Sequence, residues 1–366
     1  MALNPRKDSM KQTRREFLSS SALAAAAGLV SGCKTAGSPA FAEGAEDMGP
    51  SLPHAEVRRN GRLTGKKCSY FCDDVIWVLR DITRRRPKSI FDHSFLGVLK
   101  ECHEKYGLKM QLNLFYRTDF FYGLDEFSLA DVTDAYKAEF GANAGWLKLG
   151  FHSLQEFPDY PWINASYEDV KTLFGRIHGE VVRFAGEDSF ARACVPHWCP
   201  MSKDGVRALK DCGIRIMECT YGPRYRYDGR PERLADGYAA RVMQNRRPEV
   251  GFYGRHSICS YNHMTREQAA GTVQSFNYLH DRETGMNFKR MFNDAPCLNG
   301  CTLESLKADL GKVLGREHLV FSNHEQYFYK DYLAYQPEYA DKVRLLCRTM
   351  RDNGYEFMFL QDLVEG

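Results

Sequence analysis

Residues 147–158 read LKLGFHSLQEFP, and this stretch organises the rest of the chain. Alternating apolar residues up to Phe151 predict a buried strand that ends at His152. Glu156 follows four residues after the histidine, and the prolines that come next limit any helix here to one turn. One turn brings His152 and Glu156 to the same side, where an imidazole and a carboxylate can share one divalent metal. The spacing alone is a weak motif, and a strand cap followed by a solvated loop charge is the alternative interpretation.

Strand-like runs alternate with helix-like runs through the body of the chain. The strand-like runs are residues 68–72, 108–116, 146–152, 191–197, 214–220, 251–258, 318–324 and 355–360. The helix-like runs, with capping residues or closing glycines, are residues 94–106, 131–140, 166–184, 202–211, 302–314 and 337–353. Seven or eight strands in this alternation predict an α/β fold, a (β/α) barrel built on a parallel sheet.

Polar residues gather at the C-terminal ends of these strands, which is where barrels of this type carry their chemistry. The set comprises Asp73, Asp74, Asn113, Tyr116, Arg117, His152, His197, Glu218, Asn323, His324 and Glu325. Asp73 and Asp74 are adjacent and point in different directions, so one carboxylate can bind a metal while the other accepts a proton. The alternative for this pair is a helix N-cap, where aspartate is common.

Aromatic residues are dense around the same strand ends. Sugar rings stack their C–H faces on aromatic rings, so these positions suit a carbohydrate cleft. We expect the substrate to contact Tyr116, Arg117, His197, Trp198 and Asn323. The alternative is that about half of the aromatic residues are plain core or rim residues, which a chain with 13% aromatic content supplies in any case.

Composition restricts the class of protein. The chain has 366 residues and is 43% hydrophobic, enough for one large domain or two small ones. Its net charge of +3 equals the charge of residues 1–32 alone, which carry five Lys or Arg and two acids, so the remaining body is near neutral. Bulk charge therefore gives no indication of nucleic-acid binding. Most of the cysteines lie in apolar runs, which favours buried thiols over a disulfide framework.

The N-terminus has the features of an export signal. Arg14 and Arg15 form a twin-arginine pattern, and the apolar segment at residues 22–30 is too short to span a bilayer. Residues 29–33, LVSGC, look like a lipobox with Cys33 as the lipidated residue. We therefore expect a periplasmic or cell-surface protein, exported by the twin-arginine route and anchored by lipid to a bacterial membrane. An ordinary signal peptide with a chance cysteine is the alternative.

The rest of the chain divides into a tether and one domain. Behind the signal at residues 1–32, residues 33–66 are rich in Gly, Ala, Pro and charge, which is typical of a flexible tether. We expect the barrel domain to occupy residues 67–366. Within it, residues 222–300 contain few long apolar runs, so we expect an irregular insertion over the barrel mouth.

Several strand ends resemble the motifs of the polysaccharide deacetylase family (carbohydrate esterase family 4 and relatives). Residues 71–74, FCDD, resemble the first motif, which ends in two aspartates. Residues 152–156, HSLQE, resemble the second motif, whose usual form is His-Ser/Thr-x-x-His. Residues 195–198, VPHW, lie where the third motif falls, and residues 321–325, FSNHE, resemble the last. The closing segment, residues 353–364, also resembles the family's last strand and helix.

The resemblance implies a site and a reaction. Asp74 and His152 would bind one divalent metal, with Glu156 in the place of the usual second histidine. Asp73 would be the general base for a metal-activated water, and His324 the general acid, in the removal of an N- or O-acetyl group from a glycan. We expect zinc, with manganese, iron, cobalt or nickel as alternatives, because Glu156 adds an oxygen ligand and a negative charge.

The third motif departs from the family pattern because it lacks the usual arginine. The task of orienting the base would then fall to Arg192, Arg80 or His197. A glycoside hydrolase or other C–N hydrolase on the same barrel, or an inactive glycan-binding surface lipoprotein, are the alternative functions. The sequence implies a carbohydrate substrate and a membrane as partners; it implies no nucleic acid and no protein partner.

Overall fold

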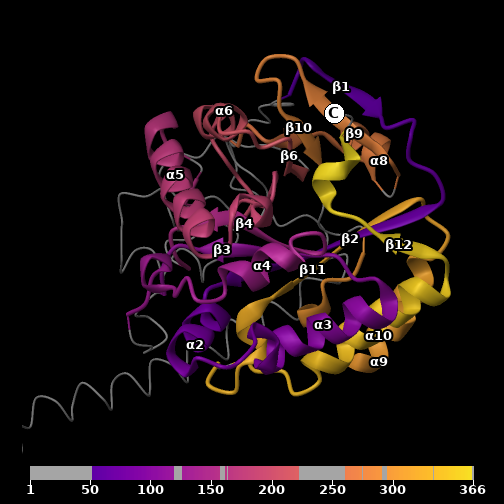
Figure 1. Cartoon of the computed structure of the whole chain (residues 1–366). Helices are drawn as coiled ribbons and strands as arrows, with labels where there is room; N and C mark the ends of the chain where they lie inside the picture. Colours follow the sequence, from indigo (N-terminus) through magenta and orange to yellow (C-terminus); the bar gives the residue numbers. More distant parts are fainter. Residues whose placement is uncertain are drawn as a thin grey trace, which may run out of the picture.

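The computed structural model (Figure 1) describes residues 52–118, 126–156, 161–162, 164–221, 260–273, 275–290, 295–332 and 334–364. The expected signal sequence and the lipidated Cys33 lie outside these residues and stay predictions. Within the described ranges, no helix has both the length and the apolar character that crossing a bilayer requires.

Parallel strands form the centre of the molecule. They are β2 (Lys66–Val75), β3 (Met110–Phe115), β4 (Leu147–Ser153), β5 (Ala193–Cys194), β6 (Ile216–Glu218), β10 (Asn287–Lys289) and β11 (His318–His324). Two parallel series, β11-β2-β3-β4 and β5-β6-β10, are joined by a parallel bridge between Leu149 and Phe190. No backbone pairing between described residues joins β10 to β11. The predicted α/β barrel is confirmed. Seven parallel strands form these two series, and β12 (Tyr355–Phe357) pairs in parallel with the start of β2. Among the described residues the barrel is open between β10 and β11.

An apolar cluster inside the barrel shows that the sheet curls round on itself. Its members come from strands that are not all neighbours, and from the segment that ends in the 3-10 turn η9 (Leu360–Leu363). They are Phe71, Ala193, Val195, Ile216, Phe276, Tyr278, Val320, Met358, Leu360 and Leu363. Alternate residues of a strand share one face, so Asp73 lies two residues beyond Phe71, and His324 four residues beyond Val320, on the inward side. A polar layer at the C-terminal strand ends therefore follows the apolar one.

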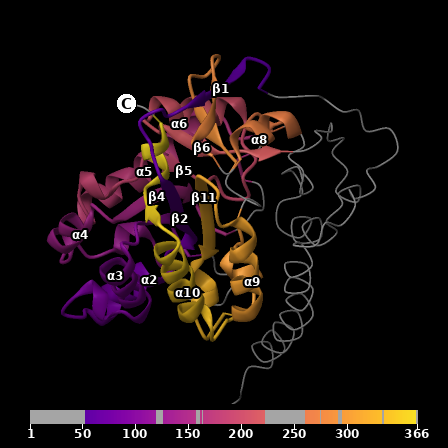
Figure 2. The same ribbon diagram turned by 90° about the vertical axis from the view of Figure 1, so that its right-hand side faces the viewer.

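Helices cover the outside of the barrel. They are α2 (Trp77–Arg85), α3 (Ser94–Tyr106), α4 (Lys137–Asn143), α5 (Tyr167–Phe184), α6 (Lys203–Asp211), α8 (Arg266–Thr272), α9 (Leu303–Val313) and α10 (Tyr339–Asp352). Ser166, the predicted cap, accepts an N–H bond at the start of α5, and Ser202 and Thr302 do the same at the start of α6 and α9. Figures 1 and 2 show α10 packed between α3 and α9. Helices α2 and α8 lie outside the predicted helix-like runs.

The expected tether contains a strand. β1 (Ala55–Arg59) pairs antiparallel with β9 (Asn277–Asp281), and β9 pairs antiparallel with β10. Arg59 also forms a 2.6 Å ion pair with Glu317. The prediction of a tether is therefore wrong for residues 55–59, because a polar, half-exposed strand has no apolar run that marks it in the sequence.

The expected insertion is regular where the structure describes it. Residues 263–289 contain β8 (His263–Met264), which pairs with β7 (Thr220–Tyr221), then α8, β9 and β10. The prediction of an irregular insertion is wrong for these residues, since β10 supplies a parallel strand of the barrel. The other part of the predicted insertion, residues 222–259, lies outside the described residues, together with the strand predicted at residues 251–258.

Candidate metal centre

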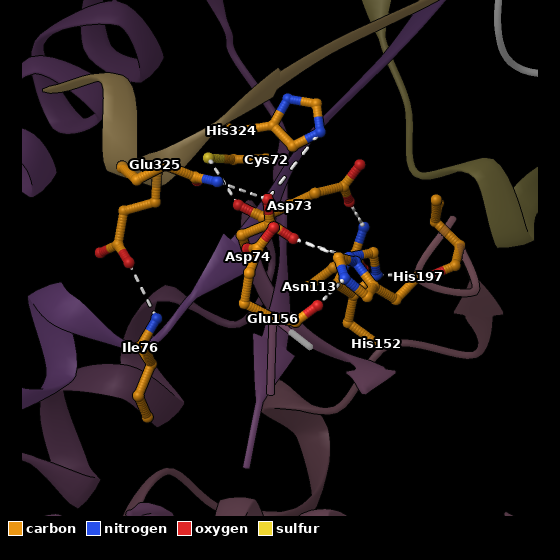
Figure 3. Close-up of polar contacts among 12 residues, drawn as sticks. Cys72, Asp73, Asp74, Ile76, Asn113, His152, Glu156, His197, His324 and Glu325 are labelled. Carbon is orange, nitrogen blue, oxygen red and sulfur yellow. Dashed lines mark hydrogen bonds and ion pairs between the residues drawn. The ribbon is translucent and has the colours of Figure 1, made fainter. Parts of the chain in front are cut away.

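Three buried side chains converge at the C-terminal end of the barrel (Figure 3): Asp74 from β2, His152 from β4 and His197 from the segment after β5. Asp74 Oδ1 lies 3.1 Å from His152 Nε2 and 3.3 Å from His197 Nδ1. The two imidazole nitrogens are 3.1 Å apart. Within the described residues, this is the group of His, Cys, Asp and Glu side chains that could hold a metal ion.

The hydrogen bonds on the far side of each imidazole fix its tautomer. His152 Nδ1–H donates to the Val195 carbonyl at 2.6 Å, and His197 Nε2–H donates to the Glu156 carbonyl at 2.8 Å. Burial, the largest effect, lowers the pKa of His152, so its imidazole is neutral at pH 7. In the neutral imidazoles that have these tautomers, His152 Nε2 and His197 Nδ1 carry lone pairs that face the Asp74 carboxylate oxygen. This donor set fits a divalent cation such as zinc, and the carbonyl bonds are the outer contacts that orient histidine ligands.

The backbone bends sharply to present Asp74. Its φ is 62°, in the left-handed region that non-glycine residues rarely adopt, and β2 loses its regular register with β3 between Cys72 and Val75. Gln326 Nε2 donates to Asp74 Oδ2 at 2.7 Å. Burial alone would raise the pKa of Asp74, but His324, His152 and His197 together hold it well below its usual range. The carboxylate is therefore ionised and aimed at the histidines.

Asp73 and His324 flank this cluster. Asp73 is 1% exposed and accepts a 2.6 Å bond from Asn113 Nδ2, and burial and the Asp74 charge raise its pKa well above the usual value. His324 Nε2 lies 4.0 Å from Asp74 Oδ2, and its side chain is 28% exposed. Burial lowers the pKa of His324, against the opposing effect of Asp74, and its Nδ1 lies 3.0 Å from Asn299 Oδ1. Figure 3 shows His324 approaching Asp74 from a different direction than His152 and His197.

The structure does not bring the Glu156 carboxylate into the group of converging ligand atoms. Glu156 is half-buried and takes part through its main-chain carbonyl, while His197, which we expected to contact substrate, supplies the third ligand atom. The Glu156 charge contributes, after burial and Tyr327, to the raised pKa of Tyr332. The third candidate ligand atom in this group therefore comes from the segment after the next strand of the barrel, β5.

The other expected substrate contacts divide into buried and accessible positions. Tyr116 is 9% exposed, with the Arg176 guanidinium 4.1 Å from its ring centroid. Asn323 is 1% exposed and donates to the Tyr70 hydroxyl at 2.8 Å. Both are held within the protein. Arg117 is exposed, where its Nε donates to Gln155 at 2.6 Å, and Trp198 is half-buried with φ 61°. Of these four residues, only Arg117 and Trp198 are placed to contact a ligand.

Glu325 is a structural residue of the site that the sequence analysis left without a role. It is fully buried and accepts N–H bonds from Ile76, Trp77 and Val78 at 2.8, 2.8 and 2.6 Å. Burial raises the pKa of Glu325 to about 7, and the N–H bonds offset part of that increase. Glu325 thus caps α2 and ties the end of β11 to the turn that carries Asp73 and Asp74.

Comparison with known proteins gives partial likeness to solved structures. No family model and no curated protein matches the sequence. The 4-alpha-glucanotransferase from Thermococcus litoralis overlaps 82% of this chain with a TM-score of 0.45 and 10% identity, and the chain spans 40% of that protein. A family 4 acetyl xylan esterase from Clostridium thermocellum, in complex with a cobalt ion, overlaps 81% with a TM-score of 0.38 and 11% identity, over 90% of its own length. These overlaps are too loose to indicate a function for this chain.

Proposed function

We propose that the protein is a metal-dependent hydrolase that removes N- or O-acetyl groups from a carbohydrate. The observation that carries this proposal is the convergence of lone-pair atoms from Asp74, His152 and His197, beside the two proton-transfer groups Asp73 and His324. The order of motifs supports it, because it resembles the polysaccharide deacetylase pattern. With His197 in place of Glu156, the ligand set is again one aspartate and two histidines, as in that pattern.

The residues divide the chemistry between them. A divalent ion held by Asp74, His152 and His197 supplies Lewis-acid chemistry when bound, since it polarises a carbonyl oxygen and makes water more acidic. Asp73, with its raised pKa, suits a general base that takes the proton of the attacking water. In its imidazolium form, His324 gives the Nε2 proton to the departing amine or alcohol and becomes neutral, while Nδ1–H continues to donate to Asn299 Oδ1.

A carbohydrate substrate is proposed from the family resemblance and from the accessible side chains near the cluster. Trp198 follows the ligand His197 directly and is half-buried, so one ring face can stack on a sugar. Arg117 is exposed and offers a guanidinium for hydroxyl or carboxylate groups.

We also propose that the mature protein is exported and anchored by a lipid on Cys33, from the twin-arginine pattern and the lipobox-like LVSGC segment. Fractionation of cells that express the wild type or Cys33→Ser tests this. Anchoring predicts wild-type protein in the membrane fraction and the variant in the soluble fraction; equal distributions would contradict it.

The test of function combines metal analysis with product analysis. The purified chain should bind about one divalent ion and release acetate from some member of a panel of N- and O-acetylated sugars, and a chelator should abolish the release. Asp74→Asn should lose both metal and activity. The proposal is wrong if Asp74→Asn keeps both. New reducing ends without acetate would indicate a glycoside hydrolase, and sugar binding that survives chelation without any product would indicate a binding protein.

A further inference from the structure

Two buried amides form a row along the inside of β3 that ends at Asp73. Gln111 Nε2 donates to Asn113 Oδ1 at 2.6 Å and to the Ala193 carbonyl at 3.0 Å. Asn113 Nδ2 donates in turn to Asp73 Oδ1 at 2.6 Å (Figure 3). Gln111, Asn113 and Asp73 are 4%, 0% and 1% exposed, so water does not compete for these bonds. Each amide therefore fixes the orientation of the next group.

Gly150 on β4 makes the space that this row occupies. It lies opposite Asn113 in the parallel register. A Cβ atom at position 150 would stand 2.7 Å from Asn113 Oδ1 and 2.9 Å from Gln111 Nε2, closer than packed atoms approach. Gly150 does not adopt a positive φ, so backbone conformation does not explain the glycine. The amide row explains it.

Among the described residues, no cation beside Asp73 takes the place of the arginine that the third motif lacks. Arg192 donates to Glu187, Arg80 pairs with Asp81, and His197 belongs to the metal cluster. Within the described part of the chain, Asn113 is the side chain that hydrogen-bonds the catalytic carboxylate. None of the three side chains proposed from the sequence performs this task.

We propose that Asn113 is the positioning residue for the general base Asp73, with Gln111 holding the amide from behind and Gly150 leaving it room. The inference rests on the proposed function for the role of Asp73. Asn113 occupies Oδ1, so Oδ2 is the oxygen that accepts the proton of the attacking water. A neutral amide thus orients the base in this protein, whereas the third polysaccharide deacetylase motif uses an arginine.

Two different substitutions should each remove the hydrogen bond that holds the Asp73 carboxylate in place. Asn113→Ala removes the donor, and Gly150→Ala pushes the amide aside. Each should lower kcat by about 100-fold, the order of a general-base contribution, with metal content and KM essentially unchanged. Combining them should cost no more than Asn113→Ala alone, because the shortened side chain at position 113 leaves nothing for the new methyl to displace. Gly175→Ala on α5, where a Cβ meets nothing within 4 Å, is the matched control and should keep wild-type kcat.

Crystal structures of the same variants separate this inference from the proposed function. Asp73 should rotate away from its wild-type position in Asn113→Ala and Gly150→Ala, while Asp74 stays in place. If the wild type hydrolyses no member of the panel, the proposed function fails, and the position of Asp73 in the variants still decides this inference. An unmoved Asp73 carboxylate, or wild-type kcat in a folded, metal-loaded variant, would overturn it. Gly150→Ala provides the answer if Asn113→Ala does not fold.

Discussion

Two buried carboxylates hold backbone turns in this protein, and they do so from very different distances along the chain. Asp281 accepts bonds from the N–H groups of Glu283 and Thr284, two and three residues further on. Glu325 accepts bonds from the first N–H groups of α2, between 247 and 249 residues away. The first turn is a local motif. The second forms only when β11 lies beside β2, so the turn that carries the candidate site depends on the assembled barrel.

The metal cluster repeats this contrast between local and distant partners. Glu156 is four residues from His152 and matches a local ligand spacing, whereas His197 is 45 residues away and reaches the cluster through its strand. Parallel strands bring their C-terminal ends to one edge, so a residue at the end of β5 meets the end of β4 in space. Topology, rather than local spacing, thus brings the third candidate ligand to the cluster.

The largest expected effect tests this choice of ligand. His197→Ala should weaken zinc binding by more than about 100-fold, because outer contacts of a ligand alone are worth roughly 10- to 100-fold. Glu156→Gln keeps the main-chain carbonyl that His197 uses, so its Kd for zinc should equal that of the wild type. Competition titration with a chromophoric chelator measures both constants. If Glu156→Gln lost the metal and His197→Ala kept it, the local ligand pair would be the correct one.

The next effect concerns the long-range hydrogen bonds that Glu325 accepts from the start of α2. Glu325→Ala leaves three buried N–H groups without their acceptor and should lower the free energy of unfolding by about 3 kcal/mol. Urea denaturation followed by circular dichroism measures the change. The control is Glu104→Ala, whose side chain is 61% exposed in a helical pair with Lys100 and whose loss should barely change the free energy of unfolding. Equal losses in the two variants would show that Glu325 does not stabilise the turn.

The smallest effect concerns the local turn and carries a pH dependence. Burial alone would raise the pKa of Asp281, but bonds from Thr284 and Tyr261 outweigh it and lower the pKa. Folding therefore favours the ionised form, and this stabilisation is present above the unfolded pKa and is lost as pH falls below it. Asp281→Asn should cost about 1 kcal/mol near neutral pH, and the deficit should shrink in acid. Urea denaturation near neutral pH and in acid measures the difference in unfolding free energy between the wild type and the variant. A difference that is the same at the two pH values would contradict this prediction.

The order of strands and helices could be predicted because its signals are local. Ser166, Ser202 and Thr302 mark helix starts, and Gly107 ends α3 with φ 75°. Helix α2 has no such mark, since its N-cap residue Ile76 offers no capping side chain and the cap comes from β11. A cap supplied by a residue about 250 positions further along the chain leaves no mark beside the helix in the sequence.

The candidate site could be predicted in part for the same reason. Asp73, Asp74, His152 and His324 end strands, and strand ends are readable from apolar runs. The role of His197, and those of Asn113 and Gly150, depend on which strands are neighbours. Gly150 offered a signal, because a glycine inside an apolar strand often marks a close approach from another chain segment.

Residues 324–326 are consecutive, and each performs a different task at the turn after β2. His324 faces Asp74, Glu325 caps the helix that follows it, and Gln326 holds the second oxygen of Asp74. The distance between His324, the proposed proton donor, and Asp74, a candidate metal ligand, thus depends on the three consecutive residues 324–326. A one-residue insertion there would change all three contacts together. Evolution toward a larger or smaller substrate is therefore expected to proceed at the exposed rim, where Arg117 and Trp198 can change without altering that separation.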